Sequence, residues 1–289
     1  MSAELLVPLD GSKAAEHVLP TALAIAAARG QRIHFLEVLD PAAEGPTGFA
    51  EPRRSDDIFR SYVAELVARH RVRPVEWSST CVFGMPAETI LFVSANADMI
   101  ALASHGRGGV RSVLLGSVAD RVVRGAHVPV LVVPALGPLA PFGTGPILVA
   151  LDGSAESARS LPVARDLAAR LGRSVALLEA YLPDMVQIGP AESDYYPPRY
   201  IESLEASIGE RLATVALPGE QTLVARGPAD KAIVEHATAL DASLVVLASS
   251  RKGVAQRIAI GSSTSGVLHR WRRPALIVPP STEDGGSRR

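Results

Sequence analysis

Two aspartates, each directly after a run of apolar residues, are the side chains of this chain best placed to do chemistry. They are Asp10 and Asp152, and each is followed by Gly-Ser. Further along each half, a second Gly-Ser pair opens a helical stretch, at Gly116-Ser117 and Gly261-Ser262. An apolar strand that passes through a glycine-bearing turn into a helix presents backbone N–H groups to a phosphate. Because a carboxylate suits ribose hydroxyls, the pattern predicts a nucleotide site in each half.

A second interpretation of the same residues needs no ligand. Asp-Gly-Ser after a strand is also an ordinary turn, in which Ser12 would cap the helix that follows. Lone glycines after a strand are often plain turn residues. The nucleotide hypothesis therefore depends on the carboxylate and the glycine turn occurring together, twice.

The elements that must position these residues follow from the hydrophobic pattern. Runs rich in Val, Ile and Leu alternate with stretches rich in Ala, Arg and Glu, and the order occurs twice, 142 to 145 residues apart. This alternation predicts βαβ units and a parallel sheet with helices on both faces. The predicted strands are Glu4–Leu9, Ile33–Leu39, Val75–Val82, Asp98–Ala103, Val130–Val133, Ile147–Leu151, Val175–Tyr181, Gln221–Ala225, Leu244–Ala248 and Ala275–Val278. In the first half, helices are expected at Ser12–Arg29, Ser55–Arg71, Pro86–Asn96 and Val113–Ala126.

The repeat also sets the expected domains. A first domain is expected over residues 1–136, a linker over 137–145, a second domain over 146–280 and a flexible tail over 281–289. Gly30 and Gly172 follow the first helix of each copy and are predicted to be its C-caps.

Composition agrees with a folded two-domain chain. The 289 residues allow about 140 per domain, and 47% of them are hydrophobic. A net charge of −1 gives no reason to expect a nucleic-acid or membrane partner. The single cysteine, Cys81, excludes an intramolecular disulfide, and no apolar run reaches the roughly 18 residues of a membrane span. The start also lacks the basic residues of a signal peptide, so we expect a cytoplasmic protein.

The glycine spacing carries a family resemblance. The first half has Ala103-Ser-His-Gly106, nine residues, then Gly116-Ser117. This resembles the nucleotide motif of the universal stress proteins in their tandem two-domain form, which is Gly, two residues, Gly, nine residues, Gly, then Ser or Thr. Only the leading glycine differs. The blocks Val7–Ser12 and Pro129–Val133 also resemble the first and fifth strands of that family.

The resemblance spans nearly the whole chain and implies an α/β fold of two doubly wound, Rossmann-like or flavodoxin-like sheets. Each would have five parallel strands in the order 3-2-1-4-5. Family members pair through their fifth strands, so the halves would form an internal pseudo-dimer, or whole chains would form a homodimer.

The resemblance further implies an adenine nucleotide, commonly ATP with Mg²⁺, and assigns residues to it. Asp10 would take the ribose, the backbone of Val38 the adenine, and Pro8 and Leu9 would line the base pocket. The phosphates would be surrounded by Ala103, Gly106, Arg107, Gly116, Ser117 and Val118. The matching positions of the second half are Ala150, Leu151, Asp152, Ala180, Ala248, Arg251, Gly261, Ser262 and Ser263.

The second copy departs further from the motif, and its binding stays open. Arg251 stands in place of the second glycine. An arginine there costs about 1–2 kcal/mol if the backbone must be left-handed. A guanidinium also binds phosphate bidentately, so the change can replace a contact as well as remove one.

Three functions remain open from the sequence. The first is a stress-response regulatory protein whose ATP occupancy changes its conformation or associations with a protein partner. The second is an enzyme with slow ATP hydrolysis or adenylyl transfer, although no nucleophile, base and orienting group stand together and we expect at most weak hydrolysis. No metal-ligating cluster is expected from the scattered histidines. The third is a dimerisation module without nucleotide, favoured by Ala103, Ala248 and Arg251.

Overall fold

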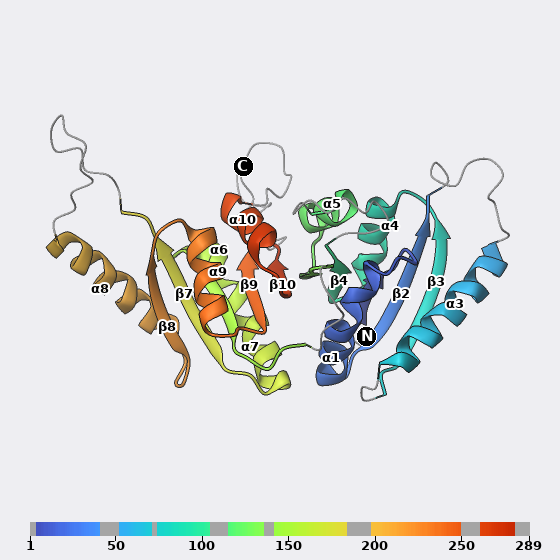
Figure 1. Ribbon diagram of the computed structural model, residues 1–289, viewed down its shortest axis with the longest axis horizontal. Helices are drawn as coiled ribbons and strands as arrows, with labels where there is room; N and C mark the ends of the chain where they lie inside the picture. Colours follow the sequence, from blue (N-terminus) through green and yellow to red (C-terminus); the bar gives the residue numbers. More distant parts are fainter. Residues whose placement is uncertain are drawn as a thin grey trace, which may run out of the picture.

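The computed structural model describes residues 4–40, 52–70, 74–104, 115–135, 142–183, 198–249 and 261–280. Helices lie on both faces of one sheet (Figure 1). The first half contains β1 (Glu4–Pro8), η1 (Ala15–Val18), α1 (Leu19–Arg29), β2 (Arg32–Leu39), α3 (Pro52–Arg69), β3 (Trp77–Phe83), α4 (Pro86–Val93), η2 (Ser94–Asn96), β4 (Met99–Ala103), α5 (Ser117–Gly125) and β5 (Val130–Val133). The second half contains β6 (Ile147–Leu151), α6 (Ala155–Ala158), α7 (Ser160–Leu171), β7 (Val175–Tyr181), α8 (Pro198–Val215), β8 (Gln221–Arg226), α9 (Ala229–Ala239), β9 (Leu244–Ala248), α10 (Ser262–Arg270) and β10 (Ala275–Val278).

The sheet has ten strands among the described residues, in the order β3-β2-β1-β4-β5-β10-β9-β6-β7-β8. Strands pair in parallel within each half, so both halves have the predicted order 3-2-1-4-5. Between the halves, β5 pairs with β10 antiparallel, and Leu131 lies opposite Leu276. The predicted fold class and the internal pseudo-dimer are therefore confirmed.

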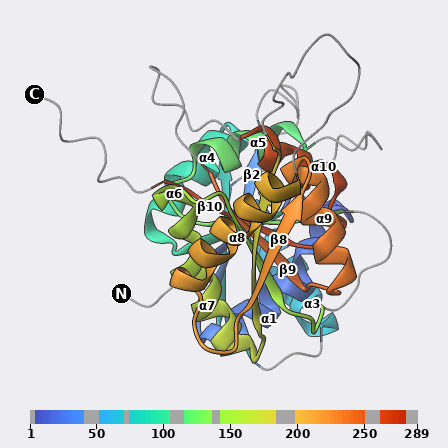
Figure 2. The same ribbon diagram turned by 90° about the vertical axis from the view of Figure 1, so that its left-hand side faces the viewer.

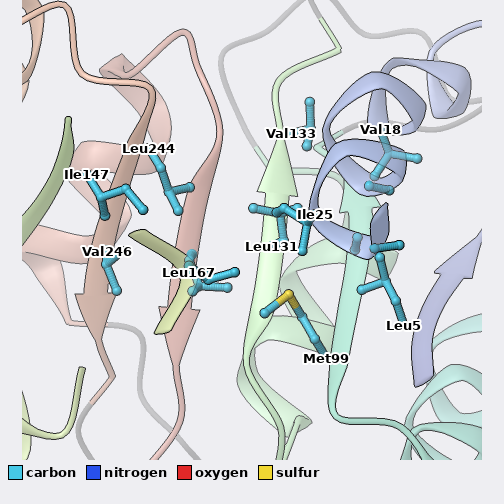
Figure 3. Packing of buried hydrophobic residues seen from close by; sticks show 14 of the residues in the cluster. Leu5, Val18, Ile25, Met99, Leu131, Val133, Ile147, Leu167, Leu244 and Val246 are labelled. Atoms are coloured by element: carbon cyan, nitrogen blue, oxygen red, sulfur yellow. The ribbon is translucent and has the colours of Figure 1, made fainter. Parts of the chain in front are cut away.

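Two apolar layers, one on each face of the sheet, run through both halves without a break. Alternate residues of β1 face opposite layers, with Leu5 and Val7 in one and Leu6 in the other. The first layer packs under η1, α1, α3, α7 and α8, and the second under α4, α5, α9 and α10. Leu131 from β5 and Leu167 from α7 belong to the same layer, although they come from different halves (Figure 3). Burial of this kind stabilises by roughly 25 cal/mol per Å² of apolar surface.

The helices α1 and α7 meet below the seam between the halves (Figure 1). An ion pair joins them, with Arg29 Nε 3.4 Å from Asp166 Oδ2. The helix α8 lies on the outer side of the second half, in front of β8 in Figure 2. Each half thus contributes one helix to the seam and keeps one on the outside.

Several predicted helices begin or end differently in the structure. The predicted helix Ser12–Arg29 is a 3₁₀ turn, η1, followed by α1, because Pro20 has no N–H to continue an α-helical ladder back to Glu16. Pro86–Asn96 is likewise α4 followed by the 3₁₀ turn η2. The helix predicted from Val113 begins at Ser117, while positions 113 and 114 lie outside the described residues.

Most of the predicted linker and the whole of the predicted tail also lie outside the described residues. Within the described residues, no helix combines the length and the apolar character that a membrane crossing requires.

Candidate functional site

The strand registers of the first half bring five of the predicted site residues to one edge of the sheet. Pro8 is level with Leu36, and Leu9 N–H donates to Leu36 O at 2.9 Å, so Asp10 comes level with Val38 on β2. On the other side, Leu6 pairs with Ile100, which brings Ala103 level with Leu9. The carboxyl ends of β2, β1 and β4 therefore present Val38, Asp10 and Ala103 side by side.

A single backbone hydrogen bond adds the start of α5 to this edge. Gly116 N–H donates to Ser104 O at 2.7 Å, and Ser104 directly follows β4. Gly116 is the N-cap of α5, with φ −60° and ψ 153°, a backbone that any residue can adopt. The first N–H groups of α5, at Ser117 and Val118, have no partner within the helix itself. They therefore lie at the strand edge that carries Asp10.

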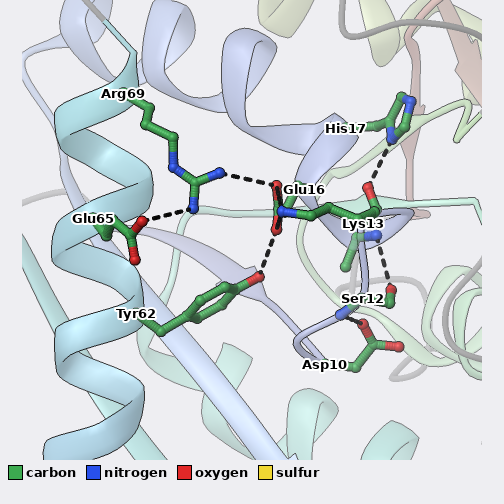
Figure 4. A network of polar contacts seen from close by, with 9 residues as sticks. Asp10, Ser12, Lys13, Glu16, His17, Tyr62, Glu65 and Arg69 are labelled. Atoms are coloured by element: carbon green, nitrogen blue, oxygen red, sulfur yellow. Dashed lines mark hydrogen bonds and ion pairs between the residues drawn. The ribbon is translucent and has the colours of Figure 1, made fainter.

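The turn that carries Asp10 is closed by its own residues. Ser12 N–H donates to Asp10 Oδ1 at 3.0 Å, and Ala15 N–H donates to Ser12 Oγ at 3.1 Å (Figure 4). Gly11 has φ 75°, the left-handed region in which glycine avoids the Cβ clash. The sequence-based interpretation of Ser12 as a cap is confirmed, and it holds together with the oriented carboxylate rather than instead of it.

The second half repeats this turn around Asp152. Ser154 N–H donates to Asp152 Oδ1 at 3.0 Å, and the Ser154 hydroxyl donates to the same oxygen. Ser157 Oγ accepts from Asp152 N–H at 3.3 Å and donates to Ser154 O at 2.9 Å. Burial alone would raise the pKa of Asp152, but the hydrogen bonds from Ser154 and Ser157 outweigh it, and the pKa of Asp152 lies below its ordinary value. The carboxylate is therefore ionised and oriented at neutral pH.

The register of the second half gathers the matching residues. Leu151 pairs with Glu179, so Asp152 comes level with Ala180, and Val149 pairs with Val246, so Leu151 comes level with Ala248. Ala150 precedes Leu151 on β6, as Pro8 precedes Leu9 on β1.

The glycine at the start of α10 stands in open space. Gly261 is the N-cap of α10 with φ −58°, so its backbone does not require glycine. A Cβ built on it would have no neighbouring atom within 4 Å in the described part of the chain. Ser262 and Ser263 follow as the first, exposed residues of the helix. Among the described residues, neither strain nor packing explains the missing side chain.

Three predicted site residues, Gly106, Arg107 and Arg251, lie outside the described residues. The arrangement above therefore depends on the carboxylates, the strand ends and the helix starts.

Sequence reasoning assigned no role to two glutamates that are buried near these turns, although Glu179 stands out there because Glu37 matches it on the second strand of the first half. Glu16, only 3% exposed, lies in η1 and faces Lys13, Tyr62 and Arg69 (Figure 4). In the second half, the carboxylate of Glu179, on β7, accepts from both the Nε and the Nη2 of Arg211 on α8. The sequence around a glutamate in a helical or strand stretch does not reveal that it is buried, because partners such as Tyr62 and Arg211 come from distant segments.

The guanidinium of Arg211 also touches the second turn. A Cβ on Gly153, which has φ 77°, would lie 2.9 Å from Arg211 Nε. Glycine at this position is therefore required twice, by the left-handed backbone and by the arginine packed against it.

Metal and thiol chemistry find little support in the described part of the chain. It contains no group of three or more His, Cys, Asp or Glu side chains able to hold a metal ion. Cys81 is a buried thiol on β3, and its Sγ lies 3.6 Å from Glu37 Oε2.

With the fold and both edges described, comparison with known proteins identifies the class. The Universal stress protein family model matches residues 1–134 and again 143–279, and the chain belongs to that family, with two of its domains in tandem.

The chain is similar to universal stress protein Rv2005c of Mycobacterium tuberculosis, with 32% identity over 237 residues and 78% of each chain covered. It is 25% identical to universal stress protein Rv1996 of the same organism over 303 aligned positions, which cover 94% of each chain. Among solved structures, a universal stress protein from Archaeoglobus fulgidus superposes with a TM-score of 0.65, 19% identity and 97% of each chain covered. Protein PA1789 of Pseudomonas aeruginosa superposes with a TM-score of 0.70 and 19% identity, covering 96% of this chain and 93% of that one. These structural likenesses concern the fold.

Proposed function

We propose that the protein is an adenine-nucleotide-binding regulatory protein of the stress response, with one site at the carboxyl edge of each half. The observation that carries the proposal is the bond from Gly116 N–H to Ser104 O, which sets the start of α5 beside Asp10. A helix start favours an anion through its N–H groups and its dipole, and a carboxylate nearby accepts bonds from ribose hydroxyls.

The residues present fit such a ligand. The open space at Gly261 is the kind of cradle that a phosphate occupies when it approaches backbone amides closely. Charge-assisted bonds from these amides contribute roughly 1.5–3 kcal/mol each, so three or four are enough for micromolar affinity after the cost of association. Mg²⁺, which keeps several waters and binds through phosphates, needs no protein cage of its own.

In this proposal the chain's own residues bind and orient the nucleotide. Asp10 and Asp152 orient the ribose, the backbone at Val38 and Ala180 meets the base, and the starts of α5 and α10 hold the phosphates. ATP occupancy is then the signal that a protein partner reads. We propose no catalytic residue.

Calorimetric titration with ATP tests the proposal. The unmodified chain should bind two nucleotides, and at 100 times the dissociation constant the ligand should stabilise the fold by about 2.7 kcal/mol. Gly116→Val should remove the first site and Gly261→Val the second, because each added side chain projects from the N-cap of the helix whose N–H groups would hold the phosphates. Both backbones accept valine, so the fold should stay intact.

A matched control exists on α8. Gly209 also has open space around it and no positive φ, but it lies within a helix away from either edge. Gly209→Val should leave both affinities unchanged. If the unmodified chain neither binds ATP nor gains stability from it, the proposal is wrong and the interaction-module alternative stands.

A further inference from the structure

The buried carboxylate of Glu16 joins the Asp10 turn to the helix α3. Lys13 Nζ lies 2.9 Å from Glu16 Oε1 and 3.2 Å from Oε2. From α3, the Tyr62 hydroxyl donates to Oε1 at 3.3 Å, and Arg69 Nη1 lies 3.8 Å from Oε2. Figure 4 shows these groups converging on Glu16 from both sides, with Asp10 and Ser12 on the turn beside them.

Glu16 is also tied to the turn through its backbone. Glu16 N–H donates to Ser12 O at 3.3 Å, and Ser12 N–H holds Asp10 Oδ1. A shift of Glu16 therefore moves Ser12, and with it the carboxylate of Asp10. The side chains of Tyr62 and Arg69 on α3 contact the Glu16 carboxylate, and the Glu16 backbone contacts Ser12, which orients Asp10 Oδ1.

The electrostatic surroundings agree with this connection. Burial raises the pKa of Tyr62, and the negative charges of Glu16 and Asp10 raise it further, so the hydroxyl stays a donor at any physiological pH. The field of Asp10 thus reaches the same hydroxyl that Glu16 holds. The positive charges of Lys13 and Arg69 lie beside Glu16 and offset its negative charge.

The second half supports its turn with different residues. Ala158 stands where Glu16 does, and Ser157 stands where Ala15 does. The hydroxyl of Ser157 bonds within the turn, to Asp152 N–H and Ser154 O. At these two positions the first half has Ala15-Glu16 and the second half has Ser157-Ala158. The first half therefore ties its turn to α3 through a carboxylate, and the second half uses a hydroxyl within the turn.

We propose that Glu16 is a positioning residue of the first-half site, which holds α3 against the Asp10 turn and so presets the carboxylate for the ribose. This inference rests on the proposed nucleotide binding. Without Glu16, the turn loses its anchor on α3, and the ammonium of Lys13 is released to compete for Asp10. Preorganisation of a binding group contributes affinity because its ordering cost is met before the ligand arrives.

Titration of the full chain with ATP, in a Gly261→Val background that leaves the first site to be measured, tests the inference. Glu16→Ala should weaken binding about tenfold, because the site must then be ordered on binding. Ala15→Ser together with Glu16→Ala should recover most of that loss, since it transplants the internal hydroxyl of the second half. In an Asp10→Asn background, Glu16→Ala should cost less than about twofold, because its effect passes through Asp10.

Glu65→Ala is the matched control. Glu65 lies 3.7 Å from Arg69 on the exposed side of α3, and its side chain is 73% exposed, so affinity should change by less than about twofold. Glu16→Gln keeps the shape of the side chain and serves if Glu16→Ala does not fold. If the Gly261→Val parent binds ATP and Glu16→Ala binds it equally well, or if the Ser transplant recovers nothing, the inference is wrong. If neither the unmodified chain nor the parent binds ATP, the proposed function fails and takes the inference with it.

Discussion

The two Asp-Gly-Ser turns share their backbone and differ in what supports them. Gly11 and Gly153 have φ values of 75° and 77°, and in both turns the serine N–H donates to the aspartate Oδ1 at 3.0 Å. In the first half, the support reaches outward through Glu16 to α3. In the second half, the hydroxyls of Ser154 and Ser157 close the turn, and Arg211 from α8 packs against Gly153. The shared feature is the presented carboxylate, and different side chains achieve it.

The buried glutamates near the turns show the same contrast in their surroundings. Glu16 has three partners of mixed chemistry, the ammonium of Lys13, the hydroxyl of Tyr62 and the guanidinium of Arg69. Glu179 has one cationic partner among the described residues, Arg211, which meets both of its oxygens. A carboxylate with several partners tolerates the loss of one better than a carboxylate with a single partner.

The largest expected effect follows from this difference. Arg211→Ala leaves the Glu179 side chain, which is 6% exposed, as an uncompensated charge. We expect a loss of about 3 kcal/mol in the free energy of unfolding, at the low end for a buried pair because Arg211 is 43% exposed. Lys13→Ala should cost at most about 1 kcal/mol, because Tyr62 and Arg69 remain with Glu16.

Urea unfolding, with hydrogen exchange of β2 and β7 to separate the halves, measures both values. Arg211→Met combined with Glu179→Leu is the control, since removal of both charges should recover most of the stability. Equal costs for the Arg211 and Lys13 variants would contradict the comparison.

A second ionic contact, between Arg165 and Glu220, makes the second half sensitive to acid. Arg165 donates to both oxygens of Glu220 at 2.7 Å and to Val215 O at 2.7 Å, which fixes the connection from α8 to β8. The hydrogen bonds from Arg165 hold the pKa of Glu220 below its ordinary value. A lowered folded pKa gives stability that is present above the unfolded pKa and is lost as the pH falls through the folded pKa.

Arg165→Met should therefore cost about 2 kcal/mol at pH 7, and this cost should shrink as the pH falls toward 2 and Glu220 takes up a proton in the unmodified chain. Urea unfolding at both pH values measures the difference. The matched first-half variant is Leu23→Met, because Leu23 occupies the position of Arg165 and has no charge. It should show no pH-dependent difference from the unmodified chain. A cost for Arg165→Met that does not change with pH would contradict the assignment to Glu220.

Strand positions were predicted well because they depend on patterns within short segments, whereas the strand order was predicted from the family resemblance. The apolar run of β6 and the alternation along β1 are visible in the sequence, and the repeat fixes their equivalence. The turns were predictable for the same reason, since Asp10, Gly11 and Ser12 are neighbours along the chain.

The supports of the turns could not be predicted, because they join distant segments. Tyr62 and Glu16 are 46 residues apart, and they meet only after β2 and α3 have packed. The start of α5 was placed too early because an apolar pattern before Gly116 resembles a helix, whereas the glycine is the N-cap. The residues of the proposed site itself remain a prediction to be tested by ligand binding.

The C-caps of the first long helices offer a comparison in which the halves should agree. Gly30 and Gly172 have φ 61° and 64°, and a Cβ on either would meet nothing within 4 Å. Gly30→Ala and Gly172→Ala should therefore cost the same, about 1 kcal/mol each, from the left-handed backbone alone. Denaturant titration of the two variants, with Gly209→Ala inside α8 as a control expected to stabilise, checks the equality. A cost at one cap only would show that the caps differ in a contact beyond the backbone.

The smallest expected effect concerns the charge between the halves. Asp166 lies 3.4 Å from Arg29 across the seam and 2.6 Å from Arg170 on its own helix. Since Asp166 is 38% exposed, Asp166→Ala should cost about 0.5 kcal/mol or less. Arg170→Ala removes only the contact within α7, so the difference between the two variants isolates the pair across the seam. A difference above about 1 kcal/mol would show that charge holds the halves together. A smaller one assigns that role to the β5–β10 pairing and to the apolar layers that cross it.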